Sequence, residues 1–479
     1  MASQSNPRQR NQHKPRPPIE EIEPIVRKYW AMRKTDIQIL KILREEHLDL
    51  TKYGLSINTF REMRKEMGLE RARTQKHTIE SIHEFVSELR ALYPLAGARE
   101  MSSLLFHEHG MSVPRDLLYD YFKVYEADLF RERKTRRIKR RRYWCAGAND
   151  IICVDQHDKW KYLGLAFHIG EDPFAGVIHW LKVYHNNNNP KLILSYYLDF
   201  IEEFGYMPLI TQSDLGSENY GIANAQTILR QWHDPRLRDK GTVQHRWMRS
   251  KKNIKPEIAW SQFRRRWSPG FQTLLDEGLR EGWYDTTRPI DTLTFRWLFI
   301  PYIQAELDAY VDRINNTRKR ADRNKILPHG PPKEIFEHPE RYGALDFKIK
   351  VQPEAIQYVR DRFAPPDDPI FELVPPTFAA YAGQVYAELG SPELTSKNIW
   401  QVYREMVERL EAIAARSAEG DEEYIEVVEE FDVQSQLDDM SGEAYPLMEG
   451  PGLLGGLENR REDGSFYLGG VNEGLGLGE

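Results

Sequence analysis

The sequence is poor in cysteine and in long apolar runs. Its 479 residues include only two cysteines, Cys145 and Cys153, too few for a disulfide framework or a cysteine-rich zinc site. No segment approaches the roughly 18 consecutive apolar residues of a membrane span, and the polar first residues lack the apolar stretch of a signal peptide. We therefore expect an intracellular chain without membrane association, long enough for two to four domains.

Charge is distributed unevenly along the chain. The formal net charge is −6. Residues 417–479 hold 17 acidic residues against Arg460 and Arg461, so the rest of the chain carries 65 Lys and Arg against 56 Asp and Glu. A basic body with an acidic tail fits a protein that binds a polyanion. A solvated acidic tail without a function fits the same counts.

The most basic segment is residues 131–142, which contain nine Lys or Arg and one Glu. A packed core does not tolerate such a density of charge, so the segment faces solvent or pairs with phosphate. A nuclear-import signal and an arm on the DNA backbone, with Arg137, Arg140 and Arg141 as contacts, both fit. A solvated linker is the third interpretation. The import signal predicts a location in the nucleus.

Residues 1–18 are polar, basic and rich in proline, and we expect them to be disordered. Apolar residues then recur at helical spacing, and residues 19–75 predict a helix-turn-helix-like domain. Thr35 is a typical N-cap for its second helix. Its third helix is short and basic, and we expect Arg61, Arg64 and Lys65 to contact DNA from it. A plain three-helix bundle fits almost as well.

A second helical domain is predicted over residues 76–130 and repeats this layout. One helix ends at a turn containing Gly110, and the next is opened by Ser112 and Pro114. The pattern fits a second helix-turn-helix and, equally, simple helical packing.

The periodicity changes from helix to strand after Asn149, where apolar runs rich in β-branched and aromatic residues begin. Three consecutive strands with short turns predict an antiparallel meander, and the whole order builds a mixed sheet covered by helices. The first and fourth strands end at Asp155 and Asp214, so we expect these acids at neighbouring strand ends. The predicted elements are strands at 151–154, 162–169 and 176–184, a helix at 191–204, a strand at 209–211 and a helix at 222–232.

A third acid, Glu257, begins a predicted helix. Pro256 is favoured in a first helical turn and sets the position of Glu257, and Trp260 falls on the same helical face and would pack the helix on the sheet. Two strand-end carboxylates and one helical carboxylate are the ligands that a pair of Mg²⁺ ions needs for attack on a phosphodiester. A turn cap is the alternative role for a strand-end aspartate.

Four sequence blocks between residues 144 and 336 resemble the integrase core (DDE) superfamily. Asp214, Gly216 and Glu218 match its Asp-x-Gly-x-Glu block. Residues 250–260 resemble the Ser-x-x-Asn-x-x-x-Glu-x-x-Trp block of integrase-derived, Ginger-like transposases and of fungal proteins with an integrase core. Residues 310–318 and 328–332 resemble the closing helix and the proline block of these families.

The resemblance implies an RNase H-like mixed five-stranded sheet flanked by helices. It implies two Mg²⁺ or Mn²⁺ ions on Asp155, Asp214 and Glu257, with Asp155 bridging both ions. DNA strand cleavage and strand transfer by a homo-oligomer on DNA would follow. The alternative is a domesticated nuclear DNA-binding protein that keeps the fold without catalysis.

Basic residues flank the predicted helix of Glu257. Lys251, Lys252 and Lys255 precede it, where a phosphate backbone would approach, and Arg264 and Arg265 follow Trp260. We expect these side chains to bind DNA phosphates, and a solvated basic face is the alternative for the arginines. His157 could touch substrate or belong to a surface turn.

The remaining boundaries follow from composition. A basic linker at 131–143 leads into the catalytic core at 144–340, in which residues 234–242 form an insertion and the helical residues 267–302 remain unassigned. The extension at 341–416 carries an amphipathic helix at 391–416. Binding of a partner chain through this helix and packing on its own core both fit. Residues 417–479 predict a disordered, glycine-rich tail.

Overall fold

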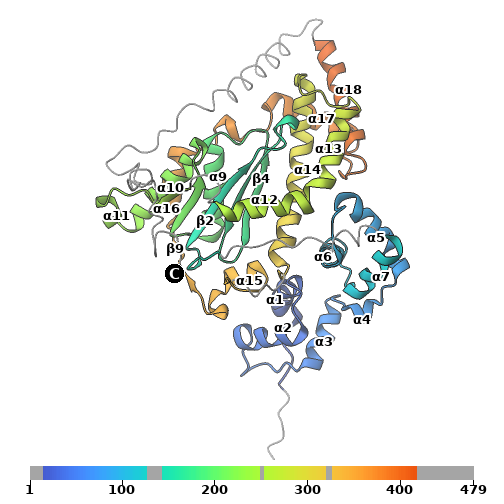
Figure 1. The fold of residues 1–479 in the computed structure, drawn as a ribbon, viewed down its shortest axis with the longest axis vertical. Helices are drawn as coiled ribbons and strands as arrows, with labels where there is room; N and C mark the ends of the chain where they lie inside the picture. Colours follow the sequence, from blue (N-terminus) through green and yellow to red (C-terminus); the bar gives the residue numbers. More distant parts are fainter. Residues whose placement is uncertain (1–13, 127–142, 249–252, 320–325, 418–479) are drawn as a thin grey trace, which may run out of the picture. The chain divides into compact units, whose positions relative to one another are not determined.

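The computed structural model describes residues 14–126, 143–248, 253–319 and 326–417 (Figure 1). Contacts divide the chain into two compact units. The helical unit comprises residues 1–89, 96–138 and 316–318, and the core unit comprises residues 90–95, 139–315 and 319–479. The predictions for the N-terminal arm, the basic linker, Lys251, Lys252 and the acidic tail lie outside the described residues, apart from a few positions at their edges.

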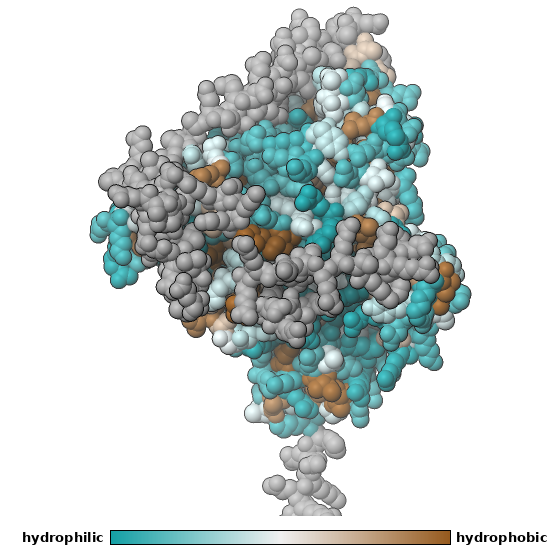
Figure 2. Space-filling model, in the orientation of Figure 1, coloured by the Kyte–Doolittle hydropathy of each residue, from teal (hydrophilic) through white to brown (hydrophobic). Residues whose placement is uncertain are grey.

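The described surface seen in Figure 2 is mainly hydrophilic, with separate apolar areas. No helix in the described ranges combines the length and the apolar character needed to cross a bilayer.

The first half of the helical unit consists of short helices whose first turns are capped by side chains. Thr35 accepts a hydrogen bond from the backbone of Gln38, whose side chain accepts one from the backbone of Thr35, and Ser56 caps a later helix through Thr59. These caps satisfy N–H groups that the helix leaves unpaired and so define where each helix begins. The helices are α1 (Ile19–Ala31), α2 (Asp36–Ile42), the π-helical turn η1 (Leu43–His47), α3 (Ile57–Glu66) and α4 (Ala72–Gln75).

The second half contains α5 (Ile79–Leu92), α6 (Ala98–His109) and α7 (Arg115–Tyr125). Gly110 ends α6 with a φ of 64°, a left-handed conformation that favours glycine. Arg33 donates to the Ser102 hydroxyl at 3.2 Å, and the Ser112 hydroxyl donates to the Glu70 carbonyl at 3.1 Å. These bonds join the two predicted helical domains within one unit.

The core unit is built on a five-stranded mixed sheet, which confirms the predicted fold class. Its strand order is β4-β3-β2-β6-β7. β2, β3 and β4 pair antiparallel, as predicted, whereas β2, β6 and β7 are parallel. The strands are β2 (Ile151–His157), β3 (Ala166–Asp172), β4 (Val177–Tyr184), β6 (Ile210–Asp214) and β7 (His245–Met248).

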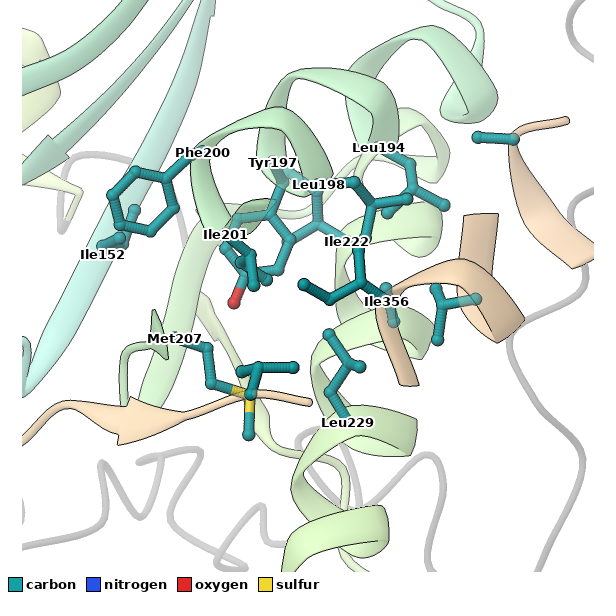
Figure 3. Packing of buried hydrophobic residues seen from close by; sticks show 14 of the residues in the cluster. Ile152, Leu194, Tyr197, Leu198, Phe200, Ile201, Met207, Ile222, Leu229 and Ile356 are labelled. Carbon is teal, nitrogen blue, oxygen red and sulfur yellow. The ribbon is translucent and has the colours of Figure 1, made fainter. Parts of the chain in front are cut away.

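Helices cover both faces of this sheet. Ile152 and Val154 of β2 point into a core formed with α9 (Pro190–Phe204), α10 (Tyr220–His233) and α16 (Pro353–Phe363) (Figure 3). Because successive residues of a strand point to opposite faces, Cys153 and Asp155 face the other side. There α12 (Ile254–Arg266) packs against β2 and β3. The acids therefore lie on the face that α12 covers.

One predicted strand begins later than expected, and one strand was missed. The strand expected at 162–169 begins only at Ala166, because Gly164 turns the chain with a φ of 74° after the 3-10 turn η2 (Lys161–Leu163). β7 was not predicted at all; the residues before it, expected to form an insertion, contain α11 (Arg236–Asp239). The short elements at the edge of the core are β1 (Gly147–Ala148) with β8 (Leu345–Asp346), β5 (Tyr206–Met207) with β9 (Ile349–Lys350), η3 (Ser217–Asn219), α15 (Pro332–Glu337), η4 (Pro339–Tyr342) and η5 (Pro369–Phe371).

The helix predicted at 391–416 is α18 (Ile399–Ser417), which starts late because Ser391 has a φ of 47° and the backbone of Thr395 donates to Asn398. Its apolar residues are buried in the core unit. Trp400 donates to the Leu274 carbonyl at 2.7 Å, and Tyr403 donates to the Asp291 carbonyl at 3.1 Å. The apolar face thus packs on its own core, which is one of the two alternatives that the sequence left open. The neighbouring helices are α13 (Ser268–Arg280), α14 (Pro289–Asn316) and α17 (Pro376–Glu388).

Candidate active site

Asp155 and Asp214 lie on adjacent parallel strands at equivalent positions. The register of β2 and β6 pairs Cys153 with Gln212, so two residues further along each strand Asp155 stands beside Asp214. Neighbouring strands are about 4.8 Å apart, and residues in register share a face. The structure therefore brings together the two strand-end acids, as the sequence predicted.

Glu257 is exposed in the first turn of α12, and Asn253 fixes where this turn begins. Asn253 is fully buried; its side-chain amide donates to the Val154 carbonyl at 2.9 Å and accepts from the Gln212 side chain at 3.1 Å. One side chain thus ties the start of α12 to both strands that carry an aspartate. In the sequence, Asn253 is recognisable only as the Asn of the 250–260 block, and its bonds to the two strands are not.

The three acids interact electrostatically. Burial raises the pKa of Asp155 to about 7, and the charges of Asp214 and Glu257 add to this, while the Gln156 backbone and the Trp260 side chain oppose it. Burial and then Glu257 also raise the pKa of Asp214. The Oδ1 atom of Asp214 is buried without a hydrogen-bond partner among the described residues. Neighbouring carboxylates repel each other when they are charged, and a cation that binds between them removes this repulsion.

These acids fit a hard divalent cation by their chemistry, because Mg²⁺ and Mn²⁺ prefer carboxylate oxygens, and the unpartnered Oδ1 of Asp214 is such a donor. In the described ranges, however, no three His, Cys, Asp or Glu side chains are close enough to form a complete metal site. The carboxylate donors are present, but in this structure the three are not close enough together to surround one ion.

Trp260 packs α12 on the sheet, as predicted. Its ring is buried and stacks on His157 of β2 at a centroid distance of 4.9 Å and an interplanar angle of 19°. His157 is 7% exposed, so its placement in a surface turn was wrong. Burial, followed by Arg264, lowers the pKa of His157 to about 4, which leaves the imidazole neutral at physiological pH. The Nε1 of Trp260 is buried without a well-formed hydrogen bond and lies near enough to Asp155 to lower its pKa.

Glu218, from the Asp-x-Gly-x-Glu block, adds a further acid beside the strand ends. It lies in η3, and its Oε1 accepts a hydrogen bond from the Asn219 side chain at 2.8 Å. Burial raises the pKa of Glu218, and the charges of Asp158 and Asp214 add to the effect. From its sequence position Glu218 was interpreted as an acid at a helix N-terminus; in the structure it also interacts electrostatically with Asp214.

The basic residues of α12 divide into two groups. Arg264 and Arg265 are exposed at its C-terminal end, and Arg265 also donates to the Ser261 carbonyl at 3.0 Å. Lys255 is turned inward: its Nζ donates to the Pro173 carbonyl at 2.6 Å and lies 4.6 Å from the centre of the Tyr143 ring. The arginines remain candidates for phosphate contact, whereas Lys255 is engaged by contacts within the core unit, and its contact with DNA stays a prediction.

Of the three residues of α3 that were predicted to contact DNA, one is buried and two are exposed. Arg64 is 4% exposed, its Nε lies 3.2 Å from the Asp36 carboxylate and its guanidinium is 5.3 Å from the Trp30 ring. Its prediction as a DNA contact was wrong, because it joins α2 to α3. Lys65 is exposed, and Arg61 is exposed with Asp36 at 3.7 Å. Glu62 and Glu66 share this exposed side, so its charge is balanced rather than basic.

Comparison with known protein families matches residues 142–339 to the family described as integrase core domain. This stretch contains the five-stranded sheet, α12 and all three candidate acids. No curated protein matches the chain.

Proposed function

We propose, from the match of residues 142–339 to the integrase core domain family, that the chain is an integrase-like DDE transposase or a protein derived from one. The family supports an integrase- or transposase-like function, a polynucleotidyl transferase chemistry and DNA as the partner in general. The finer proposal is DNA strand cleavage and strand transfer at Asp155, Asp214 and Glu257.

The observation that carries this proposal is the pair of aspartates on adjacent parallel strands beneath a helix that carries a third acid. Burial raises the pKa of both aspartates, Asp214 and Glu257 add to the effect at Asp155, and Glu257 adds to it at Asp214; cation binding relieves such repulsion. An aspartate that only caps a turn or a helix does not require this arrangement, because a cap needs one acid and no second acid beside it.

Each residue has a defined part in this proposal. Asp155 would contact both ions, with Asp214 and Glu257 each holding one. When bound, two Mg²⁺ or Mn²⁺ ions would make the attacking water or 3′-hydroxyl nucleophilic and neutralise charge on the leaving oxygen. Asn253 holds the start of α12 against both strands, and Trp260 keeps α12 on the sheet.

DNA would reach the site along basic side chains. We infer that exposed Arg264 and Arg265, and on the helical unit Arg61 and Lys65, bind phosphates, because Arg and Lys at a surface release counterions from DNA on contact. An assembly of several copies on DNA and a location in the nucleus complete the proposal.

Nicking and strand transfer on plasmid DNA with Mg²⁺ or Mn²⁺ test the proposal. We expect activity in the wild type and losses of at least about 100-fold in Asp155→Asn, Asp214→Asn and Glu257→Gln, the scale of losing one electrostatic contact to a transition state. Glu354→Gln is the matched control, because Glu354 is also an exposed acid in the first turn of a helix. Equal activity in all five proteins contradicts the proposal.

One observation favours the rival proposal of a DNA-binding protein without catalysis. The described residues contain no preformed cluster of three metal ligands. The same assay separates the two proposals, because the rival predicts retained DNA binding with no nicking in the presence of either metal.

A further inference from the structure

Glu171 is a carboxylate buried under α12 that the proposed reaction does not use. It is 5% exposed, and its Oε1 atom has no hydrogen-bond partner among the described residues. The register of β2 and β3 pairs it with Cys153, so it lies on the same sheet face as Asp155. Burying an uncompensated carboxylate is unfavourable, so the structure has to compensate this charge.

Two lysines supply the compensation. Burial raises the pKa of Glu171, and Lys255 and then Lys319 oppose that rise by stabilising the charged form. Lys319 donates to the Gly176 carbonyl at 2.9 Å. Lys255 comes from the first turn of α12, so the charge of Glu171 acts directly on that turn.

Lys255 is held by three kinds of contact at once. Its ammonium donates to the Pro173 carbonyl at 2.6 Å, lies 4.6 Å from the centre of the Tyr143 ring and feels the Glu171 charge. A carbonyl, an aromatic face and a carboxylate are all favourable for a cation. Such a lysine is anchored beneath the helix rather than free to follow a phosphate backbone.

The helix geometry links this anchor to Glu257. Residues two positions apart on an α-helix point about 200° apart around its axis. With Lys255 drawn toward Pro173 and Tyr143, Glu257 leaves the helix in a different direction, in which it is exposed and its charge acts on Asp155 and Asp214. We propose that Lys255, anchored by Pro173, Tyr143 and Glu171, is a positioning residue that fixes the direction in which Glu257 leaves the helix.

This inference rests on the proposed function for its effect on catalysis, but not for its effect on α12. The first test is therefore hydrogen exchange of the backbone amides of residues 254–260 in the full-length protein. We expect Lys255→Met to speed this exchange by about tenfold or more, Glu171→Gln to do so less, and Lys255→Arg to leave it near the wild type. The double variant with Glu171→Gln and Lys255→Met should exchange like Lys255→Met alone, because both substitutions remove the same interaction between Lys255 and Glu171.

The second test separates an anchor from a DNA contact. Removing one phosphate contact lowers the slope of log affinity against log salt concentration by about 1. We expect this from Arg264→Met, the exposed control on the same helix, and not from Lys255→Met. Where the wild type cleaves DNA, Lys255→Met should lower kcat by about tenfold or more with little change in KM.

Unchanged exchange in Lys255→Met, together with a salt slope lowered by about 1, overturns the inference and makes Lys255 a DNA contact. A wild type that never cleaves DNA overturns the proposed function instead, while the exchange experiment still decides the role of Lys255. Circular dichroism of each variant, and the retained fold of Lys255→Arg, exclude unfolding as the cause of faster exchange.

Discussion

Asp155 is a proposed metal ligand whose pKa is raised by burial and by neighbouring charges. Its pKa is raised from an ordinary value of 3.8 to about 7 by burial first and by Asp214 and Glu257 after it. The folded protein therefore binds a proton at Asp155 that the unfolded chain releases near pH 4. The stability that this proton provides is fully present below about pH 4 and is lost as the pH rises through about 7.

Asp155→Asn should stabilise the metal-free core unit in a pH-dependent way. An asparagine carries no charge, so its advantage is small at pH 4, grows between pH 4 and pH 7 and is constant above that range. One pKa unit corresponds to about 1.4 kcal/mol, so the advantage reaches at most about 4 kcal/mol. Denaturant unfolding at pH 4, 6 and 8 in EDTA measures it.

The control for this prediction is Glu354→Gln, which removes an exposed acid far from the cluster in sequence. Its effect on unfolding should not follow the same pH profile. An Asp155→Asn effect of the same size at all three pH values would contradict the raised pKa. Saturating Mn²⁺ should remove the advantage of asparagine, because the ion stabilises only the aspartate form.

At the level of residues, the sequence predicted what depends on local signals. Thr35 was recognisable as a helix cap, and Asp155 and Asp214 as strand ends, because each is defined by its neighbours in the chain. The bond from Asn253 to Val154 joins residues 99 positions apart, and the inward turn of Lys255 depends on Glu171. Long-range partners of this kind leave no trace in local spacing.

Packing between helices of the core unit can be tested at two glycines. A Cβ atom at Gly278 of α13 would lie 2.1 Å from the Trp400 ring of α18, whereas one at Gly383 of α17 meets nothing within 4 Å. We expect Gly278→Ala to destabilise the unit by about 1–3 kcal/mol through overpacking. Gly383→Ala should instead stabilise it by up to about 1 kcal/mol through helix propensity.

Denaturant unfolding followed by tryptophan fluorescence measures both changes. The two variants add the same methyl group within a helix, so helix propensity alone would give them the same sign. Stabilisation by Gly278→Ala would show that Trp400 does not pack against α13 as described.

Among the elements, long periodic segments were predicted well and short ones were not. α9 and α10 have strong helical periodicity, and their predicted ranges agree with the structure to within one or two residues at each end. β7 has only four residues, and its pairing with β6 is what makes it a strand. The start of α18 was placed too early, because the turn at Ser391 depends on a backbone conformation that periodicity does not reveal.

For the whole molecule, the two compact units predict two unfolding transitions, since each has its own buried core. Phe60→Ala should lower only the transition of the helical unit, and Ile201→Ala only that of the core unit, each by about 2–5 kcal/mol. Mn²⁺ at about 100 times its Kd should stabilise only the core unit, by about 2.7 kcal/mol. Differential scanning calorimetry with and without Mn²⁺ measures these shifts.

Asp214→Asn is the control for the effect of Mn²⁺, because it removes a proposed ligand while Phe60 and Ile201 are unchanged. Mn²⁺ should then no longer move the core transition. One transition that all variants shift together would contradict independent unfolding of the two units.

The Asn253 amide has a consequence for the order in which the molecule is assembled. Its two partners, Val154 and Gln212, belong to strands joined by a long stretch of chain and lie side by side only after β2 and β6 have paired. Before this pairing, Asn253 cannot bond to Val154 and Gln212 at the same time, and the start of α12 is not held beside the two aspartates. The bonds of this amide therefore depend on the pairing of the sheet. During synthesis on the ribosome, the three acids come together only after the parallel strands β2 and β6 have paired.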